Sequence, residues 1–204
     1  MRTIFRLAFL AAIAFAPITT FSADLEKGLA AFNAGDYATA LAECQPLAEE
    51  GNAKAQFCVG RMYANGFGVD MNDELALKWY GLAVAAGHAE AAYSLGVMHA
   101  NGWGVPMNPV AAVGYYKLAA EKGYPPALTA LGFSYKHGAG VARDFVAAVM
   151  WFDISAQRGD LTAASERDDL ADSMSAEELQ QAQQAALTWL SGFDGDSMHA
   201  DRVE

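Results

Sequence analysis

The stretch from Ala89 to Gly123, AEAAYSLGVMHANGWGVPMNPVAAVGYYKLAAEKG, decides the fold of this 204-residue chain. Its neighbours align with it without a gap, because the glycines that close successive copies recur every 36 residues, at Gly51, Gly87, Gly123 and Gly159. Other positions keep the same spacing, including Ala55, Ala91 and Ala127, and the aromatic series Trp79, Tyr115, Trp151 and Tyr80, Tyr116, Phe152. A fixed period of this size predicts a stacked helical repeat.

Each copy contains two amphipathic helix patterns. In the second, Ala112, Tyr115, Tyr116 and Ala119 stand at i, i+3, i+4 and i+7, the spacing of one helix face. Between the helices, Gly102 suits a helix end in the left-handed conformation. The next helix is predicted to begin after a residue that is a strong N-cap in every copy, namely Asp36, Asn72, Asn108 and Asp144.

Glycines also recur in the middle of the first helix of each copy, at Gly60, Gly96 and Gly132. A glycine inside a helix costs about 1 kcal/mol relative to alanine. Because this cost recurs in register, we expect a large ring from the partner helix to pack against each missing side chain.

These motifs resemble a known family. The run A-x-x-x-L-G-V-M-x-A-N-G-x-G-V, followed by a cap and A-x-x-Y-Y-x-x-A-A-x-x-G, is similar to the Sel-one-like repeat, a relative of the tetratricopeptide repeat with a longer loop between its helices. The resemblance covers roughly residues 25–189. It implies an all-α fold, a right-handed α-solenoid of antiparallel helix pairs with a C-terminal capping helix. It also implies that the chain holds other proteins, without a cofactor.

We expect the repeat domain to span residues 24–190, with units near 24–51, 52–87, 88–123 and 124–159 and a cap at 160–190. The first unit lacks four loop residues, as suits an end repeat. After Gly159 the pattern decays, and Ser175 with Glu178 forms a capping box for a last helix that is predicted to end near Leu190. Residues 191–204, rich in Gly and Asp, are predicted to be disordered.

The N-terminus has the pattern of a secretory signal peptide, residues 1–23. Arg2 and Arg6 precede and border an apolar run, and small residues lead to Asp24, so cleavage is expected after Ser22 or Ala23. A membrane anchor is the alternative, but the run is shorter than the ~20 residues of a spanning helix. We therefore expect a periplasmic or secreted protein whose mature chain does not insert into a membrane.

The chain is acidic, with a formal charge of −11. Removing residues 1–23 takes away two arginines and no acid, which leaves 11 basic against 24 acidic residues and a charge of −13. Such a balance argues against nucleic acids and anionic lipid surfaces as partners. It favours basic or neutral partners, unless the excess charge serves solubility alone.

The two cysteines, Cys44 and Cys58, stand seven residues on either side of Gly51. Antiparallel neighbouring helices would bring both to the same height, so a disulfide is expected in an oxidising compartment. Two buried free thiols are the alternative.

Candidate catalytic and metal-binding patterns are absent from the sequence. The histidines, His88, His99, His137 and His199, have no metal-ligand spacing, and no nucleophile motif such as G-x-S-x-G or S-x-x-K occurs. We expect His99, which replaces Tyr63 and Tyr135 in register, to pack in the core. We therefore expect no metal, no cofactor and no enzymatic activity.

The predicted function is recognition of a protein or peptide in a groove lined by the first helices. Positions there that vary between copies are the predicted binding residues: Lys54, Phe57, Arg61, Tyr93, Val97, Phe133 and Lys136. Phe57 and Tyr93 could instead belong to the core. Two other functions stay open, namely binding or hydrolysis of β-lactams or peptidoglycan fragments, and a structural or regulatory part in an envelope or exopolysaccharide complex.

Overall fold

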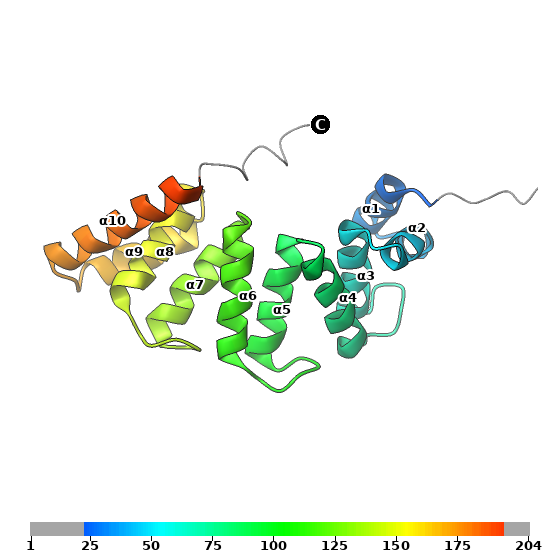
Figure 1. Ribbon diagram of the computed structural model, residues 1–204, viewed down its shortest axis with the longest axis horizontal. Coiled ribbons are helices and arrows are strands. Elements are labelled where there is room, and N and C mark those ends of the chain that lie inside the picture. Colours follow the sequence, from blue (N-terminus) through cyan, green and yellow to red (C-terminus); the bar gives the residue numbers. More distant parts are fainter. Residues whose placement is uncertain (1–22, 194–204) are drawn as a thin grey trace, which may run out of the picture.

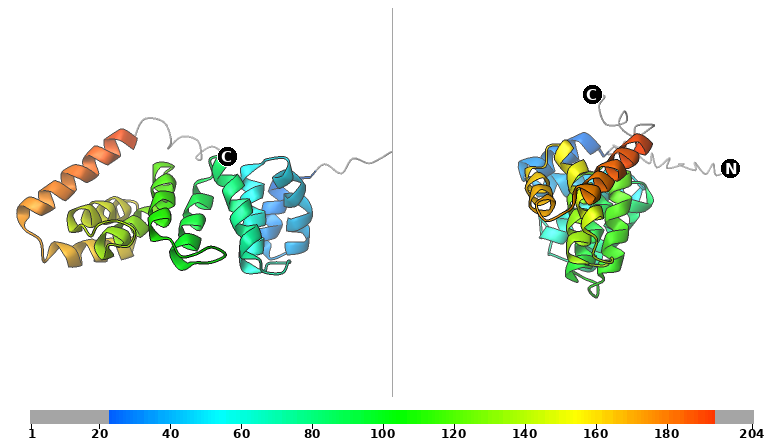
Figure 2. Two further views of the ribbon diagram at one scale, coloured as in Figure 1. Left: turned by 60° about the horizontal axis from the view of Figure 1, so that its bottom comes forward. Right: turned by 90° about the vertical axis from the view of Figure 1, so that its left-hand side faces the viewer.

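The computed structural model describes residues 23–193, which form ten helices and no strand. Figure 1 shows the helices following one another in a curved row, and the left view of Figure 2 shows α1 (blue) and α10 (orange to red) at its opposite ends, while the right view looks along the row. This arrangement confirms the predicted all-α solenoid. The helices are α1 (Leu25–Ala34), α2 (Tyr37–Glu49), α3 (Ala53–Asn65), α4 (Asp73–Ala85), α5 (Ala89–Asn101), α6 (Pro109–Glu121), α7 (Pro125–His137), α8 (Phe145–Gln157), α9 (Leu161–Ala171) and α10 (Ala176–Phe193).

The helix ends follow the predicted signals. The side chain of Asn108 accepts a hydrogen bond from the backbone N–H of Ala111, which caps the start of α6. The side chains of Asp36, Asn72 and Asp144 make the corresponding contact at the start of α2, α4 and α8. At the end of α5, Gly102 has a φ of 73°, a left-handed conformation that favours glycine.

The mid-helix glycines lie against rings of the partner helix, as predicted. A Cβ atom added at Gly96 would lie 2.5 Å from the ring of Tyr116, and one at Gly132 would lie 2.4 Å from the ring of Phe152. Gly60 approaches Tyr80 in the same way, at 2.6 Å. In these three repeats, the helix pair is thus packed by one ring that fills the place of a missing side chain, whereas Gly28 of the first unit faces Cys44 and Glu43.

The two ends of the row are closed differently. At the N-terminal end, the ring of Phe67 from the α3–α4 loop stacks on Tyr37 of the shortened first unit, with ring centroids 4.7 Å apart. At the C-terminal end, α10 packs on α8, and the rings of Trp151 and Trp189 meet edge to face at 5.4 Å. The apolar stack is therefore covered at both ends.

The last helix begins and ends in instructive places. Ser175 and Glu178 form the predicted capping box, with the Ser175 backbone N–H donating to the Glu178 carboxylate over 2.8 Å. α10 continues to Phe193, beyond its predicted end at Leu190, because Trp189 and Leu190 still pack on the core and hold the last turn.

Some predictions fall on residues outside the described range. Residues 1–22, which hold nearly all of the predicted signal peptide, and residues 194–204, most of the predicted disordered tail, are not described. Within residues 23–193, no helix combines the length and apolar character needed to cross a membrane.

Candidate binding groove

The first helices of the repeats, α1, α3, α5 and α7, together with α9, line shared pockets, and the surface that they make is here called the first-helix face. Three pockets lie along it. One lies between α1, α3 and the start of α5, the next between α3, α4 and α5, and the third between α5, α7 and the start of α9, with volumes of about 260, 200 and 390 Å³. A further pocket of about 300 Å³ lies between α6 and α7. The face is therefore hollowed along most of its length.

The first of these, here called the N-terminal pocket, combines rings and charges. α1 contributes Phe32 and α3 contributes Phe57, whose ring stacks on that of His88 with centroids 4.6 Å apart. Its lining also includes Leu29, Asn33, Lys54, Cys58, Arg61 and Glu90.

Arg61 is the cation of this pocket that lies against its aromatic rings. Its guanidinium carbon lies 4.6 Å from the ring centroid of Phe32 and 5.7 Å from that of Phe57. Neither Arg61 nor the exposed Lys54 has a carboxylate within salt-bridge distance among residues 23–193. The pocket therefore holds two cations that form no salt bridge within the described chain, with Glu90 as the carboxylate of its lining.

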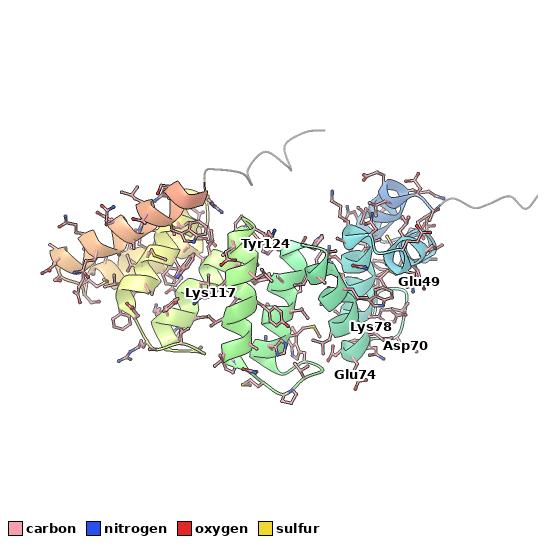
Figure 3. The ribbon with its side chains drawn as sticks, in the orientation of Figure 1. Glu49, Asp70, Glu74, Lys78, Lys117 and Tyr124 are labelled. Atoms are coloured by element: carbon pink, nitrogen blue, oxygen red, sulfur yellow. The ribbon has the colours of Figure 1, made fainter. Side chains whose placement is uncertain are left out.

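Tyrosines line the middle of the face. The ring of Tyr93 lies 5.7 Å from that of Tyr116 and 5.3 Å from that of Tyr124, which sits at the turn between α6 and α7 (Figure 3). Burial raises the pKa of Tyr124 to about 12, and the nearby carboxylate of Glu90 adds to this rise. Burial likewise raises the pKa of Tyr80 and of Tyr116 to about 12. These phenols are neutral hydrogen-bond donors at pH 7.

The C-terminal part of the face is already occupied by polar contacts within the chain. Lys136 of α7 pairs with Glu166 of α9, and Arg167 pairs with Asp153 at 3.1 Å. Thr129 donates a hydrogen bond of 2.6 Å to Asp160, which lowers the pKa of that carboxyl group, as do the backbone N–H groups at the start of α9. Helix α9 thus uses the charges that this part of the groove would otherwise present.

Six of the seven predicted binding residues line pockets of this region. They are Lys54, Phe57 and Arg61 in the N-terminal pocket, Tyr93 and Val97 in the middle, and Phe133 near α7. Lys136 instead pairs with Glu166. Phe57 is only 7% exposed and also belongs to the core, so the two readings of this residue both apply. Their part in binding stays a prediction.

Several residues of the face were not among the predicted binding residues. Phe32 belongs to the shortened first unit, whose register differs by four residues, and Tyr124 lies in a turn rather than in a helix. Glu90 carried a usable signal, because its position holds Lys54 and Pro126 in the neighbouring copies.

Comparison with known families places the repeats. The family model of the Sel1 repeat matches residues 53–88, 89–124 and 125–160, more than half of the chain. The chain belongs to the Sel1 repeat family. Sel1 repeat proteins generally mediate contacts between proteins.

Two solved structures share the Sel1 architecture. A Sel1 repeat protein from Oxalobacter formigenes is 36% identical, with a TM-score of 0.59 over 63% of this chain and 97% of its own. The protein c5321, a protective antigen present in uropathogenic Escherichia coli strains with an SLR fold, is 24% identical, with a TM-score of 0.58, and shows the fold alone. The match covers 81% of this chain but only 46% of c5321. No curated protein sequence matches the chain.

The two cysteines lie side by side on neighbouring helices. Cys44 of α2 and Cys58 of α3 are unbonded in the structure, and both are buried. An interaction between the two thiols lowers the pKa of Cys44 and raises that of Cys58. The helices therefore bring the two sulfurs together as the spacing predicts, and the disulfide itself stays a prediction.

The structure also bears on metal binding and on the position of His99. Within residues 23–193, no group of three or more His, Cys, Asp or Glu side chains is arranged to hold a metal ion. His99 stacks on Tyr115 with ring centroids 5.2 Å apart, and its Nδ1 is buried, which confirms the predicted packing role.

Proposed function

We propose that this Sel1 repeat protein is a non-enzymatic scaffold that binds a protein or peptide segment on its first-helix face, in the periplasm or outside the cell. The face supplies a preformed curved surface, so little ordering of the scaffold accompanies binding. Affinity comes from a few aromatic and charged anchors rather than from the whole area.

The observation that carries this proposal is the contrast between interior and groove within each repeat. The glycine–ring contacts of the interior recur in register at Gly60, Gly96 and Gly132. The side chains that line the pockets of the first helices change from copy to copy, as Arg61, Val97 and Phe133 show. Packing within the helix pairs explains the first set, whereas it does not explain why the second set varies, although Val97 and Phe133 also border the core.

A pair of matched variants tests the proposal. Val97→Glu places a carboxylate on the groove side of α5, whereas Gly114→Glu places the same group on α6, where a new Cβ meets no atom within 4 Å. The full-length chain with a C-terminal tag is expressed in its own cells, and bound proteins are identified by mass spectrometry after affinity capture. We expect the Val97→Glu variant to lose captured proteins that wild type and Gly114→Glu retain.

Equal capture by all three proteins would overturn the assignment of the groove. Thermal unfolding of each variant shows beforehand that the fold is intact.

The proposed location rests on the N-terminal sequence pattern. Cell fractionation with intact-mass measurement checks it, since export with cleavage after Ser22 or Ala23 gives a chain that begins at Ala23 or Asp24. A full-length chain in the cytoplasm would contradict the proposal.

A further inference from the structure

The N-terminal pocket differs in charge from the protein that surrounds it. The chain as a whole carries −11, yet the pocket is lined by two cations, Lys54 and Arg61, and a single carboxylate, Glu90. A cationic hollow on an acidic protein attracts an anionic group and holds it where field lines converge.

The setting of Arg61 suits one kind of anion. Its guanidinium carbon lies 4.6 Å from the ring centroid of Phe32 and 5.7 Å from that of Phe57, so the group is held against an apolar surface. The N–H donors of a guanidinium lie in its plane and stay available when the face is stacked. Such a planar fork matches a carboxylate with two parallel hydrogen bonds.

Lys54 extends this cationic edge. It stands seven residues, or two helical turns, before Arg61 on α3, so both side chains lie on the same face of the helix. Phe57 lies between them in the pocket. An anion at Arg61 would therefore have an apolar floor on one side and a second cation nearby.

The other end of the groove provides an internal comparison. Lys136 occupies a first-helix position in α7, but Glu166 of α9 already supplies its carboxylate. That pair shows that a cation on this face can bind a carboxylate. In the N-terminal pocket no described residue supplies that partner, and a ligand can do so.

We propose that the N-terminal pocket is the subsite of the groove that binds a carboxylate of a peptide segment, next to an apolar side chain of the same segment. Arg61 is its main anchor and Lys54 its second. The inference rests on the proposed function, since it names the chemistry of the segment that the groove receives. The carboxylate comes either from an Asp or Glu side chain or from the peptide's C-terminus.

Synthetic peptide arrays test this assignment. Random twelve-residue peptides are displayed as two sets, one with free C-terminal carboxylates and one with C-terminal amides, and probed with the labelled mature protein. We expect bound peptides to be enriched in Asp or Glu beside an apolar residue in both sets if side chains are recognised. Enrichment confined to the free-carboxylate set identifies the C-terminus as the source.

Three variants then locate the carboxylate. For the best-bound peptide, Arg61→Gln is expected to weaken binding at least about tenfold, the usual effect of losing a charge-assisted hydrogen bond. Lys54→Gln, an exposed change that spares the fold, is expected to weaken it about two- to fivefold. Lys78→Gln, at an exposed lysine of the second helix α4, is the matched control and is expected to leave the affinity unchanged.

The outcomes separate the two proposals. Bound peptides that show neither acidic enrichment nor a preference for free C-termini, or affinity that Arg61→Gln and Lys54→Gln leave unchanged, would overturn the carboxylate subsite and leave the groove intact. Absence of any bound peptide with the folded wild-type protein would overturn peptide binding by the groove, and the subsite with it.

Discussion

The two ends of the first-helix face are built from the same repeat, but their cations differ in whether they pair with a carboxylate of the chain. At the N-terminal end, Arg61 and Lys54 have no carboxylate partner in the described chain, whereas at the C-terminal end Lys136 and Arg167 are paired with Glu166 and Asp153. The difference arises because α9 lies at the C-terminal end of the face, where its Glu166 pairs with Lys136 and its Arg167 pairs with Asp153 of α8. The cations at this end therefore have partners within the chain, whereas Arg61 and Lys54 are left for recognition.

The largest expected effect concerns the two cysteines, both of which lie in the N-terminal half. We expect Cys44 and Cys58 to be bonded in the exported protein, which would then be two hydrogen atoms lighter than the dithiol by intact mass. Reduction should lower the free energy of unfolding by about 3 kcal/mol, because it frees a short loop in the unfolded chain. Urea unfolding with and without reductant measures this difference.

The double variant Cys44→Ala/Cys58→Ala is the control, in which reductant should change nothing. A mature protein with the mass of the dithiol would refute the disulfide and leave two buried thiols in its place.

The second effect concerns the packing of mid-helix glycines against rings, which we expect to be the same in both halves of the repeat domain. Gly96→Ala and Gly132→Ala each push a methyl group into a ring of the partner helix, and overpacking of this kind costs about 1–3 kcal/mol. Gly114→Ala, where a Cβ finds open space, should instead stabilise the protein by up to about 1 kcal/mol through helix propensity. Chemical denaturation of the three variants decides this. Stabilisation in all three would show that the rings do not require the glycines.

A third, smaller effect measures the charge difference itself. Lys136 and Glu166 are both about three-quarters buried at the side chain, so a double-mutant cycle with Lys136→Gln and Glu166→Gln should give a coupling free energy of up to about 1 kcal/mol. Lys54→Gln should leave the free energy of unfolding unchanged, since it breaks no pair. Destabilisation by Lys54→Gln as great as by Lys136→Gln would erase the distinction between the two ends.

The smallest effect is a change in acid sensitivity at the N-terminal end. Glu43 accepts hydrogen bonds from Lys27 and from the backbone N–H of Asp24, and these contacts lower its pKa. Its contribution is therefore complete above the ordinary pKa of 4.5 and is lost as pH falls through the lower pKa of the folded protein. As the pH falls below 4.5, the unfolding temperature should decrease more steeply for wild type than for Glu43→Gln. Parallel curves for the two proteins would remove Glu43 from this account.

Much of the fold could be predicted from the sequence because the same local signals recur in each repeat. The caps at Asn72, Asn108 and Asp144 and the capping box at Ser175 are local signals, and each lies where it was predicted. The glycine–ring contacts could be predicted because a cost that recurs in register needs a compensating contact.

The groove was less predictable because its properties depend on residues outside the repeat register. The partner of Lys136 is Glu166, which lies in the decayed pattern of α9, where alignment with other copies gives no guidance. The ring under Arg61 is Phe32, which belongs to the shortened first unit. Both contacts join segments that only the three-dimensional stack brings together.

The central claim, that the first helices and not the second form the recognition face, is tested most directly by photocrosslinking in cells. A benzophenone amino acid replaces Lys54 or Val97 on the first helices, and Lys78 or Lys117 on the second (Figure 3). We expect discrete adducts with another protein from Lys54 and Val97 and none from Lys78 and Lys117. Adducts of equal yield from the second helices, or only from them, would contradict the account.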